Sequence, residues 1–236
     1  MEITWLTDED GEEFVFENEW DIAIPVDLLL DGERLRITCF PCTENAVREW
    51  YERGWSDVFS KSALRALTEV IIPILEEHHY VPEPKRHRWG YLMRCETPQK
   101  TVAPSNIVHL SSEDEKRNLT SYDIEASLAE GCVGFGALED GRIVSLAMTH
   151  SSPDESAEIG VETVKAYRGK GYASHCLSAL TVFLNGSGFH PEYRCFADNT
   201  SSLRVAEKAG YEPKGKYYYF VLRHKKERTM EKNDGI

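Results

Sequence analysis

One stretch indicates the fold of the C-terminal half of the chain: Thr163-Val164-Lys165-Ala166-Tyr167-Arg168-Gly169-Lys170-Gly171-Tyr172-Ala173. Residues 158–164 alternate as a β-strand does, and residues 172–184 place apolar side chains on one face of a helix. The sequence therefore predicts a strand, a glycine-rich turn and an amphipathic helix that follow one another directly.

Such a turn suits an anion. The first N–H groups of a helix have no backbone partner, and the helix dipole favours negative charge beside them. Glycine lets a phosphate approach the backbone closely, and Arg168 and Lys170 add positive charge. A loop that merely needs glycine to turn is the alternative. Spacing excludes a Walker loop, because Gly171 stands where Ser or Thr is required, and a dinucleotide fingerprint, because the third glycine is missing.

The turn resembles the acetyl-CoA signature of the GNAT superfamily of N-acetyltransferases, Arg/Gln-x-x-Gly-x-Gly/Ala. Arg168, Gly171 and Ala173 fill its three specified places. In that family the amides of the turn hold the pyrophosphate of coenzyme A, and the preceding strand pairs with the pantetheine arm. The resemblance implies that the strand contributes Val161, Glu162, Thr163 and Val164. It implies that the turn and the helix start contribute Arg168, Gly169, Lys170, Gly171, Tyr172, Ala173 and Ser174.

A second match lies downstream. Residues 199–202, followed by residues 206–211, resemble the family's asparagine helix, which ends in Gly-Phe/Tyr. Asn199 stands where the family's asparagine contacts the cofactor arm, and we expect Ser202 to contribute beside it. An asparagine cap and a terminal glycine would also mark any short helix. The order and spacing of the two motifs together indicate the family over roughly residues 105–225.

The catalytic groups cannot be carried over from two usual positions. Many family members place a tyrosine seven residues after the motif asparagine, as the acid that protonates the departing thiolate, and here Ala206 stands there. Some place a glutamate five residues before the asparagine, as the base, and here Arg194 stands there. Catalysis must therefore use other groups or mainly proximity.

We expect the base on the strand before the turn. Glu158 and Glu162 are an even number of residues apart, so they share one face of a regular strand. The family commonly places acid/base groups about ten residues before the turn's arginine, which favours Glu158. Two solvent-facing glutamates are the alternative. For the acid, the candidate is Tyr217, with its neighbours Tyr218 and Tyr219 on the last strand.

The 236 residues suffice for one large domain or two ordinary ones. Residues 97–106 contain two prolines and little apolar content, so we place the linker there. Residues 1–104 are then an N-terminal α+β domain of unknown role, which could lie on the substrate side. Residues 105–236 are the GNAT domain. The predicted fold class is α/β (α+β), a mixed sheet flanked by helices behind an additional α+β domain.

The net charge and the composition limit the classes of partner that the protein is expected to bind. The net charge of −13 and the pI of about 5.1 argue against nucleic acid. They suit a cationic amine, although a solvated acidic surface is the plainer explanation. No run reaches the ~18 apolar residues of a membrane helix, and the start lacks a signal peptide. We therefore expect a cytoplasmic protein that contacts no membrane. The pair Cys39 and Cys42 lacks the further ligands of a zinc site, so we expect no metal.

The sequence therefore predicts an acyl-CoA-dependent N-acyltransferase, which transfers an acetyl group from acetyl-CoA to a primary amine of a small molecule or peptide. A non-catalytic acyl-CoA-binding regulatory or scaffold protein is the alternative, and the missing tyrosine favours it. The acceptor is not named by the sequence, and homodimerisation stays open.

Overall fold

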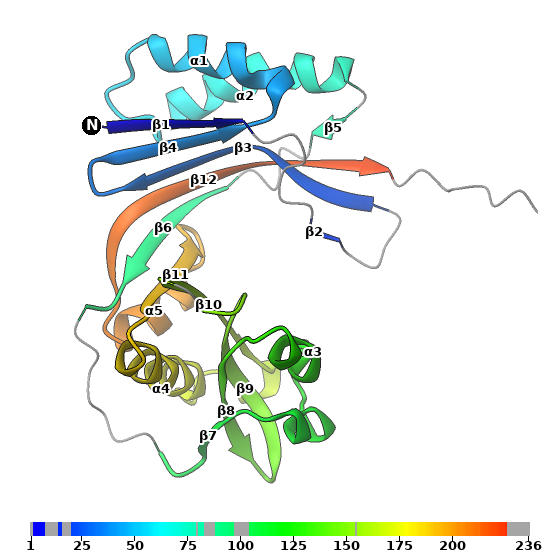
Figure 1. The fold of residues 1–236 in the computed structure, drawn as a ribbon, viewed down its shortest axis with the longest axis vertical. Helices are drawn as coiled ribbons and strands as arrows, with labels where there is room; N and C mark the ends of the chain where they lie inside the picture. Colours follow the sequence, from blue (N-terminus) through cyan, green and yellow to red (C-terminus); the bar gives the residue numbers. More distant parts are fainter. Residues whose placement is uncertain are drawn as a thin grey trace, which may run out of the picture. The chain divides into compact units, whose positions relative to one another are not determined.

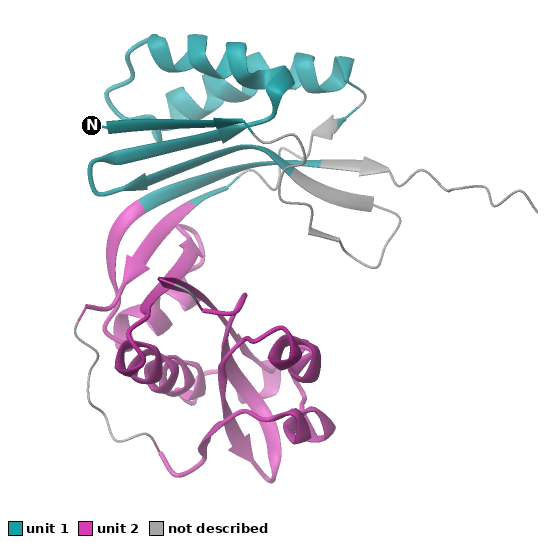
Figure 2. Ribbon diagram, viewed as in Figure 1, with its two compact units in different colours: residues 1–89, 216–236 teal, residues 90–215 magenta. Residues whose placement is uncertain are grey.

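The computed structural model describes residues 2–7, 14–15, 20–78, 80–82, 88–96, 104–153 and 155–225. The chain divides into two compact units (Figure 2). Unit 1 comprises Met1–Trp89 and Lys216–Ile236, and unit 2 comprises Gly90–Gly215. The chain passes from unit 1 to unit 2 within β6 (Arg88–Arg94) and returns within β12 (Glu212–Lys225).

Unit 1 is built on a sheet with the strand order β1, β4, β3, β12. Strand β1 (Glu2–Thr7) runs parallel to β4 (Arg34–Cys39), which pairs antiparallel with β3 (Trp20–Asp31). The short β2 (Phe14–Val15) pairs with β3, and β5 (Val81–Pro82) pairs with β12. Alternation in β4 places Leu35 and Ile37 in the core, as expected for a strand with one buried face.

Two helices cover one face of this sheet (Figure 1). The 3-10 turn η1 (Pro41–Thr43) leads into α1 (Glu44–Glu52), and α2 (Lys61–Glu77) follows. The hydroxyl of Ser60 caps α2 by accepting from the Ala63 amide at 3.2 Å. The indole of Trp50 donates to the Ala63 carbonyl at 2.8 Å and so ties α1 to α2. Helix α2 continues through Pro73.

Unit 2 is built on a second run of strands, in the order β6, β11, β10, β9, β8, β7. Their bounds are β7 (Ile107–His109), β8 (Gly134–Glu139), β9 (Arg142–Thr149), β10 (Ser156–Thr163) and β11 (His190–Phe196). All neighbours pair antiparallel except β10 and β11, which are parallel.

Helices lie on both faces of the unit 2 sheet. Helices α4 (Tyr172–Gly186) and α5 (Thr200–Lys208) contribute Leu177, Leu180 and Ala206 to one core. On the other face, α3 (Ile124–Ala129) packs Ile124 against residues of β9. The 3-10 turns are η3 (Ser112–Arg117) and η4 (Lys165–Tyr167). The predicted mixed sheet flanked by helices is confirmed.

Residues 111–130 do not form one continuous helix, because the chain forms η3 and α3 with an irregular segment between them. Asn118 explains the break. Its side chain donates to the Tyr122 carbonyl at 2.7 Å and accepts from the Thr120 amide at 2.9 Å. Such local bonds compete with the helical ones.

The boundaries of the two compact units also differ from the domain boundary expected at residue 104. Residues 90–94 belong to unit 2 because β6 pairs with β11 from Gly90 to Arg94. The chain from Lys216 belongs to unit 1 because Tyr218, Phe220 and Leu222 fill its core. Within the predicted linker, residues 97–103 lie outside the described residues.

Candidate acyl-CoA site

Strand β10 leaves its parallel neighbour part of the way along. Its register with β11 ends at Glu158, which stands opposite Glu192, whereas its register with β9 continues to Thr163. From Gly160 to Thr163, the described residues therefore provide β10 with a partner on the β9 side only. An opening in the sheet results, and one edge of β10 lines it.

Hydrogen bonds to β9 show which amides face this opening. The Glu158 carbonyl accepts from the His150 amide at 2.9 Å, and the Val164 amide donates to the Val144 carbonyl at 3.0 Å. In an antiparallel ladder every second residue turns its N–H and C=O to the same neighbour. Val161 and Thr163 therefore direct theirs toward the opening. An extended ligand could pair with this edge as an added strand.

The glycine-rich turn lies where β10 ends. Gly169 and Gly171 adopt φ values of +83° and +87°, in the left-handed region that favours glycine. No atom lies within 4 Å of the point where a Cβ would stand on Gly169. Gly171 is the N-cap of α4 and supplies no side-chain cap, so the amides of the first turn are left to a ligand or water. The predicted strand, turn and helix are confirmed.

The charged side chains of the turn already interact with other groups of the protein. Arg168 Nε donates to the Thr163 carbonyl at 3.1 Å. Lys170 Nζ lies 2.7 Å from a carboxylate oxygen of Glu139 on β8, and the Tyr172 hydroxyl donates to the other oxygen. Hydrogen bonds from Lys170 and Tyr172 hold the pKa of Glu139 below its usual range. Lys170 therefore brings its charge to the turn together with a neutralising carboxylate.

The first turns of α4 and α5 are each held by a polar side chain. The Ser174 hydroxyl donates to the Gly171 carbonyl at 2.8 Å, so it stabilises the turn itself. Asn199 caps α5 by accepting from the Ser202 amide at 3.1 Å. The Ser202 hydroxyl lies 2.9 Å from that of Tyr193 on β11. Cofactor contacts of Ala173, Asn199 and Ser202 stay predictions.

The two candidate bases share one face of β10, on the side of α3. Glu158 lies between Arg194 and His150, at 3.2 Å from Arg194 Nε and 3.7 Å from His150 Nδ1. Glu162 accepts from the amide and the hydroxyl of Ser121, at 3.1 and 2.6 Å. The carboxylate of Glu158 is therefore flanked by titratable and charged groups, whereas that of Glu162 is fixed to a loop.

The structure adds two residues that the sequence analysis did not identify, Tyr122 and His150. A Cβ on Gly160, between the two glutamates, would lie within 2.5 Å of both the Tyr122 hydroxyl and His150 Nε2. The available signal was the isolated glycine inside a strand, which often marks a close approach by another group.

The candidate acid Tyr217 lies in unit 1, where its side chain is 3% exposed and its ring centre lies 4.8 Å from that of Tyr219. Its neighbour Tyr218 is also buried, which raises the pKa of that phenol to about 12. A catalytic role for Tyr217 stays a prediction.

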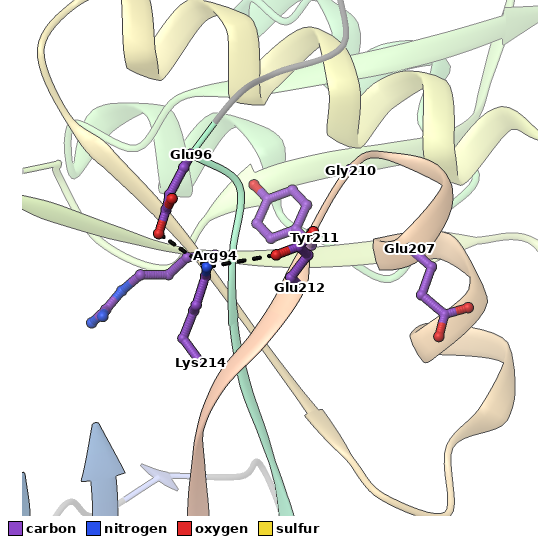
Figure 3. A pocket seen from close by; sticks show the side chains of 7 residues that line it. All are labelled: Arg94, Glu96, Glu207, Gly210, Tyr211, Glu212 and Lys214. Atoms are coloured by element: carbon purple, nitrogen blue, oxygen red, sulfur yellow. Dashed lines mark ion pairs between the residues drawn. The ribbon is translucent and has the colours of Figure 1, made fainter. Parts of the chain in front are cut away.

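Unit 2 also contains hollows away from the turn. One of about 400 Å³ is lined by Arg94, Glu96, Glu207, Gly210, Tyr211, Glu212 and Lys214 (Figure 3). Lys214 Nζ lies 3.0 Å from Glu96 and 3.6 Å from Glu212, so its charge is matched within the hollow. A larger hollow, of about 660 Å³, includes Ser156 at the start of β10 but no other residue of that strand. Neither is lined by the glycine-rich turn.

Among the residues that the structure describes, no three His, Cys, Asp or Glu side chains gather as a metal site. Cys39 and Cys42 are free thiols, and burial raises the pKa of Cys39 to about 11. The helices in the described ranges include none that is long and apolar enough to cross a membrane.

Comparisons with known proteins agree with this geometry. Residues 104–220 match the model of a family described as GNAT acetyltransferase. A GCN5-related N-acetyltransferase-like protein from Streptococcus suis 89/1591 is similar over 92% of this chain and 88% of its own, with 17% identity and a TM-score of 0.50. No curated protein matches the chain.

Two further solved structures resemble smaller parts. A putative GNAT-family acetyltransferase from Novosphingobium aromaticivorans DSM 12444 has 22% identity and a TM-score of 0.49; the match covers 60% of this chain and 66% of that protein, just under two thirds. The microcin C7 self-immunity acetyltransferase, solved with acetyl-CoA and AMP, has 19% identity and a TM-score of 0.34, over 44% of this chain and 68% of its own. Residues 104–220 therefore match the GNAT acetyltransferase family, and the chain shares the fold of the Streptococcus suis protein.

Proposed function

We propose that the chain transfers an acetyl group from acetyl-CoA to a primary amine of a small molecule or peptide. The observation that carries the proposal is the opening beside β10, which leads directly into a glycine-rich turn at the start of α4. These two features supply what coenzyme A needs, an extended backbone edge for the pantetheine amides and unpaired helical amides for the pyrophosphate.

The residues present fit this co-substrate. Val161 offers its C=O to the arm, and Glu162, Thr163 and Val164 continue the chain toward the turn. Open space around the Cβ position of Gly169 allows a phosphate to approach the backbone. The amides of Tyr172, Ala173 and Ser174 in the first turn of α4 point outward along the helix axis. The ion pair of Lys170 with Glu139 reduces what the charge of Lys170 adds to the attraction exerted by the backbone amides.

The reaction is direct attack of a neutral amine on the thioester carbonyl. The amide of Val161 is placed to stabilise the negative charge that develops on the carbonyl oxygen, because it lies at the edge where the acetyl group would end. A carboxylate must take the proton from the attacking nitrogen, and Glu158 and Glu162 lie on the adjacent face of the same strand. Two carboxylates on this face also suit an acceptor that carries positive charge elsewhere.

A non-catalytic acyl-CoA-binding regulatory or scaffold protein is the second candidate. The observation that favours it is the absence of the usual acid and base positions, which Ala206 and Arg194 occupy. Arg194 instead pairs with Glu158. This protein would bind acetyl-CoA and release no thiol.

One assay separates the two candidates. The full chain is incubated with acetyl-CoA and, in turn, spermidine, kanamycin and a lysine-containing peptide, while a thiol-reactive dye measures free coenzyme A. Release that requires an amine, with the acetylated product seen by mass spectrometry, supports the transferase. Binding of acetyl-CoA in a calorimeter without release supports the second candidate.

A further inference from the structure

Gly160 is the place where two side chains from other elements reach β10. The Tyr122 hydroxyl and His150 Nε2 both lie within 2.5 Å of the point where its Cβ would stand, closer than a real Cβ tolerates. Gly160 is not one of the glycines with positive φ, so its backbone conformation does not require glycine. The residue is therefore needed for space, and the space is used by a phenol and an imidazole that are neighbours.

The other side of the same imidazole faces Glu158. His150 Nδ1 lies 3.7 Å from Glu158 Oε1, while Arg194 Nε lies 3.2 Å from Glu158 Oε2. The two oxygens of the carboxylate thus have separate partners, and Oε1 is the one left for proton exchange. Backbone pairing supports the contact, because the His150 amide donates to the Glu158 carbonyl at 2.9 Å. Contacts of this length commonly tighten when a substrate is bound.

The phenol is held in place by its own loop. Asn118 donates to the Tyr122 carbonyl at 2.7 Å, and Asp123 directly after it caps α3 by accepting from the Ala126 amide at 2.9 Å. Burial, reinforced by the charges of Glu162 and Tyr193, raises the pKa of Tyr122 to about 12. Tyr122 is therefore protonated at neutral pH and can only donate a proton.

We propose that Glu158, His150 and Tyr122 form a carboxylate–imidazole–phenol relay, in which Tyr122 protonates the departing thiolate and Glu158 accepts the proton of the amine. This assignment rests on the proposed acetyl transfer. It supplies an acid from the loop before α3 and a base from β10, linked by a histidine directly after β9, in place of the groups missing at Ala206 and Arg194. Position supports it, because Gly160 directly precedes Val161, whose amide faces the opening.

The transfer balances within these groups. The amine nitrogen forms a bond to the carbonyl carbon, and the carbon–sulfur bond breaks. The amine proton passes to Glu158 Oε1, and the thiolate takes the phenolic proton of Tyr122. His150 then takes the proton of Glu158 at Nδ1 and gives its Nε2 proton to the phenolate, which restores Glu158 and Tyr122. His150 is left as the other tautomer and returns to the first by proton exchange with solvent, to which it is half exposed. The products are the amide and the free thiol, and no further reactant is needed.

The relay is tested in the full chain with acetyl-CoA and the best amine of the panel above. Tyr122→Phe should lower kcat by about 100-fold, within the range for general acid–base catalysis, while its calorimetric affinity for acetyl-CoA stays that of the wild type. The matched control is Tyr211→Phe, which removes another buried hydroxyl of unit 2, bonded to Thr181 at 2.7 Å, and should keep the wild-type kcat.

His150→Ala gives a second, independent reading. His150 is half exposed, so added imidazole can enter the space that its ring leaves. Imidazole should raise the rate of His150→Ala by at least about tenfold and leave the wild type and the control variant His190→Ala unchanged, because His190 is an exposed residue at the start of β11. A purely structural histidine would show no such rescue.

The outcomes keep the relay apart from the activity on which it rests. No thiol release by the wild type with any amine removes the proposed function, and the relay with it. Release by the wild type that Tyr122→Phe retains in full leaves the function standing and overturns the relay. Loss of kcat in Tyr122→Phe without imidazole rescue of His150→Ala overturns the part assigned to His150.

Discussion

Glu158 stands opposite Glu192 in the parallel pairing of β10 with β11, and it is the last residue of β10 that this register includes. The two glutamates mark the end of one ladder and the start of an opening. Glu192 is buried and forms an ion pair with Arg94 at 2.5 Å, which holds β11 to β6. Glu158 turns instead to Arg194 and His150. The same strand pair therefore ends in a structural carboxylate and in a candidate catalytic one.

The first prediction compares the two candidate bases. Glu158→Gln should lower kcat/KM by at least about tenfold and shift its pH profile, because it removes the proton acceptor. Glu162→Gln should have a smaller effect, because its carboxylate is already fixed by the Ser121 amide and hydroxyl. Steady-state rates between pH 6 and 9 measure this, with acetyl-CoA affinity unchanged in both. Wild-type rates and profiles in both variants would mean that neither residue is the base.

The second prediction concerns the ion pair beside the turn. Glu139→Gln leaves Lys170 without its carboxylate and removes a negative charge near the proposed phosphate site. Acetyl-CoA affinity should rise by about two- to fivefold, more so at low ionic strength, because exposed charges are screened by salt. Glu113→Gln is the control, since Glu113 forms a comparable exposed pair with Lys116 at 2.7 Å. Weaker binding by Glu139→Gln would show that the pair serves to orient Lys170.

The third prediction concerns the entry to the loop that carries Tyr122. Burial alone would raise the pKa of Asp114, but hydrogen bonds from Ser111 and Arg117 outweigh it and hold that pKa below its usual range. A lowered pKa stabilises the fold above the unfolded pKa, and this contribution is lost as the pH falls through the folded value. Asp114→Asn should cost about 1–3 kcal/mol at pH 7.

Urea unfolding of the wild type and Asp114→Asn at pH 7, 4 and 3 checks that prediction. The difference in free energy of unfolding should shrink as the pH falls, because the wild-type carboxylate becomes protonated and loses the same bonds. A difference that stays constant with pH would show that Asp114 acts through packing alone.

Local chemistry explains which parts could be predicted from the sequence. The turn at Gly169 and Gly171 and the cap at Asn199 depend on residues a few positions apart, so their spacing alone predicts them. The cluster at Gly160 depends on how β9 pairs with β10 and on how the loop before α3 folds back. Tyr122 and His150 reach it from different elements, and no local pattern encodes that meeting.

The boundaries of the two units could not be predicted from the sequence for a related reason. A change in composition near residue 104 indicates where a linker could lie, but it does not show that residues 216–222 return to the core of the first unit. That return depends on strand pairing across more than a hundred residues, as does the place of β6 in unit 2 beside β11. A domain predicted as the contiguous residues 105–236 therefore contains residues 216–222, which belong to unit 1, and lacks β6, which pairs with β11 in unit 2.

The central claim is that acetyl-CoA binds at the turn, and one calorimetric comparison of three proteins tests it most directly. Gly169 and Gly188 have φ values of +83° and +87° and open space around their Cβ positions, so alanine strains both backbones alike. Of these two glycines, Gly169 lies in the turn before α4, whereas Gly188 follows α4. The wild type and Gly188→Ala should bind acetyl-CoA equally, and Gly169→Ala at least about tenfold more weakly. Equal affinity of all three proteins, or no binding by the wild type, would contradict the account.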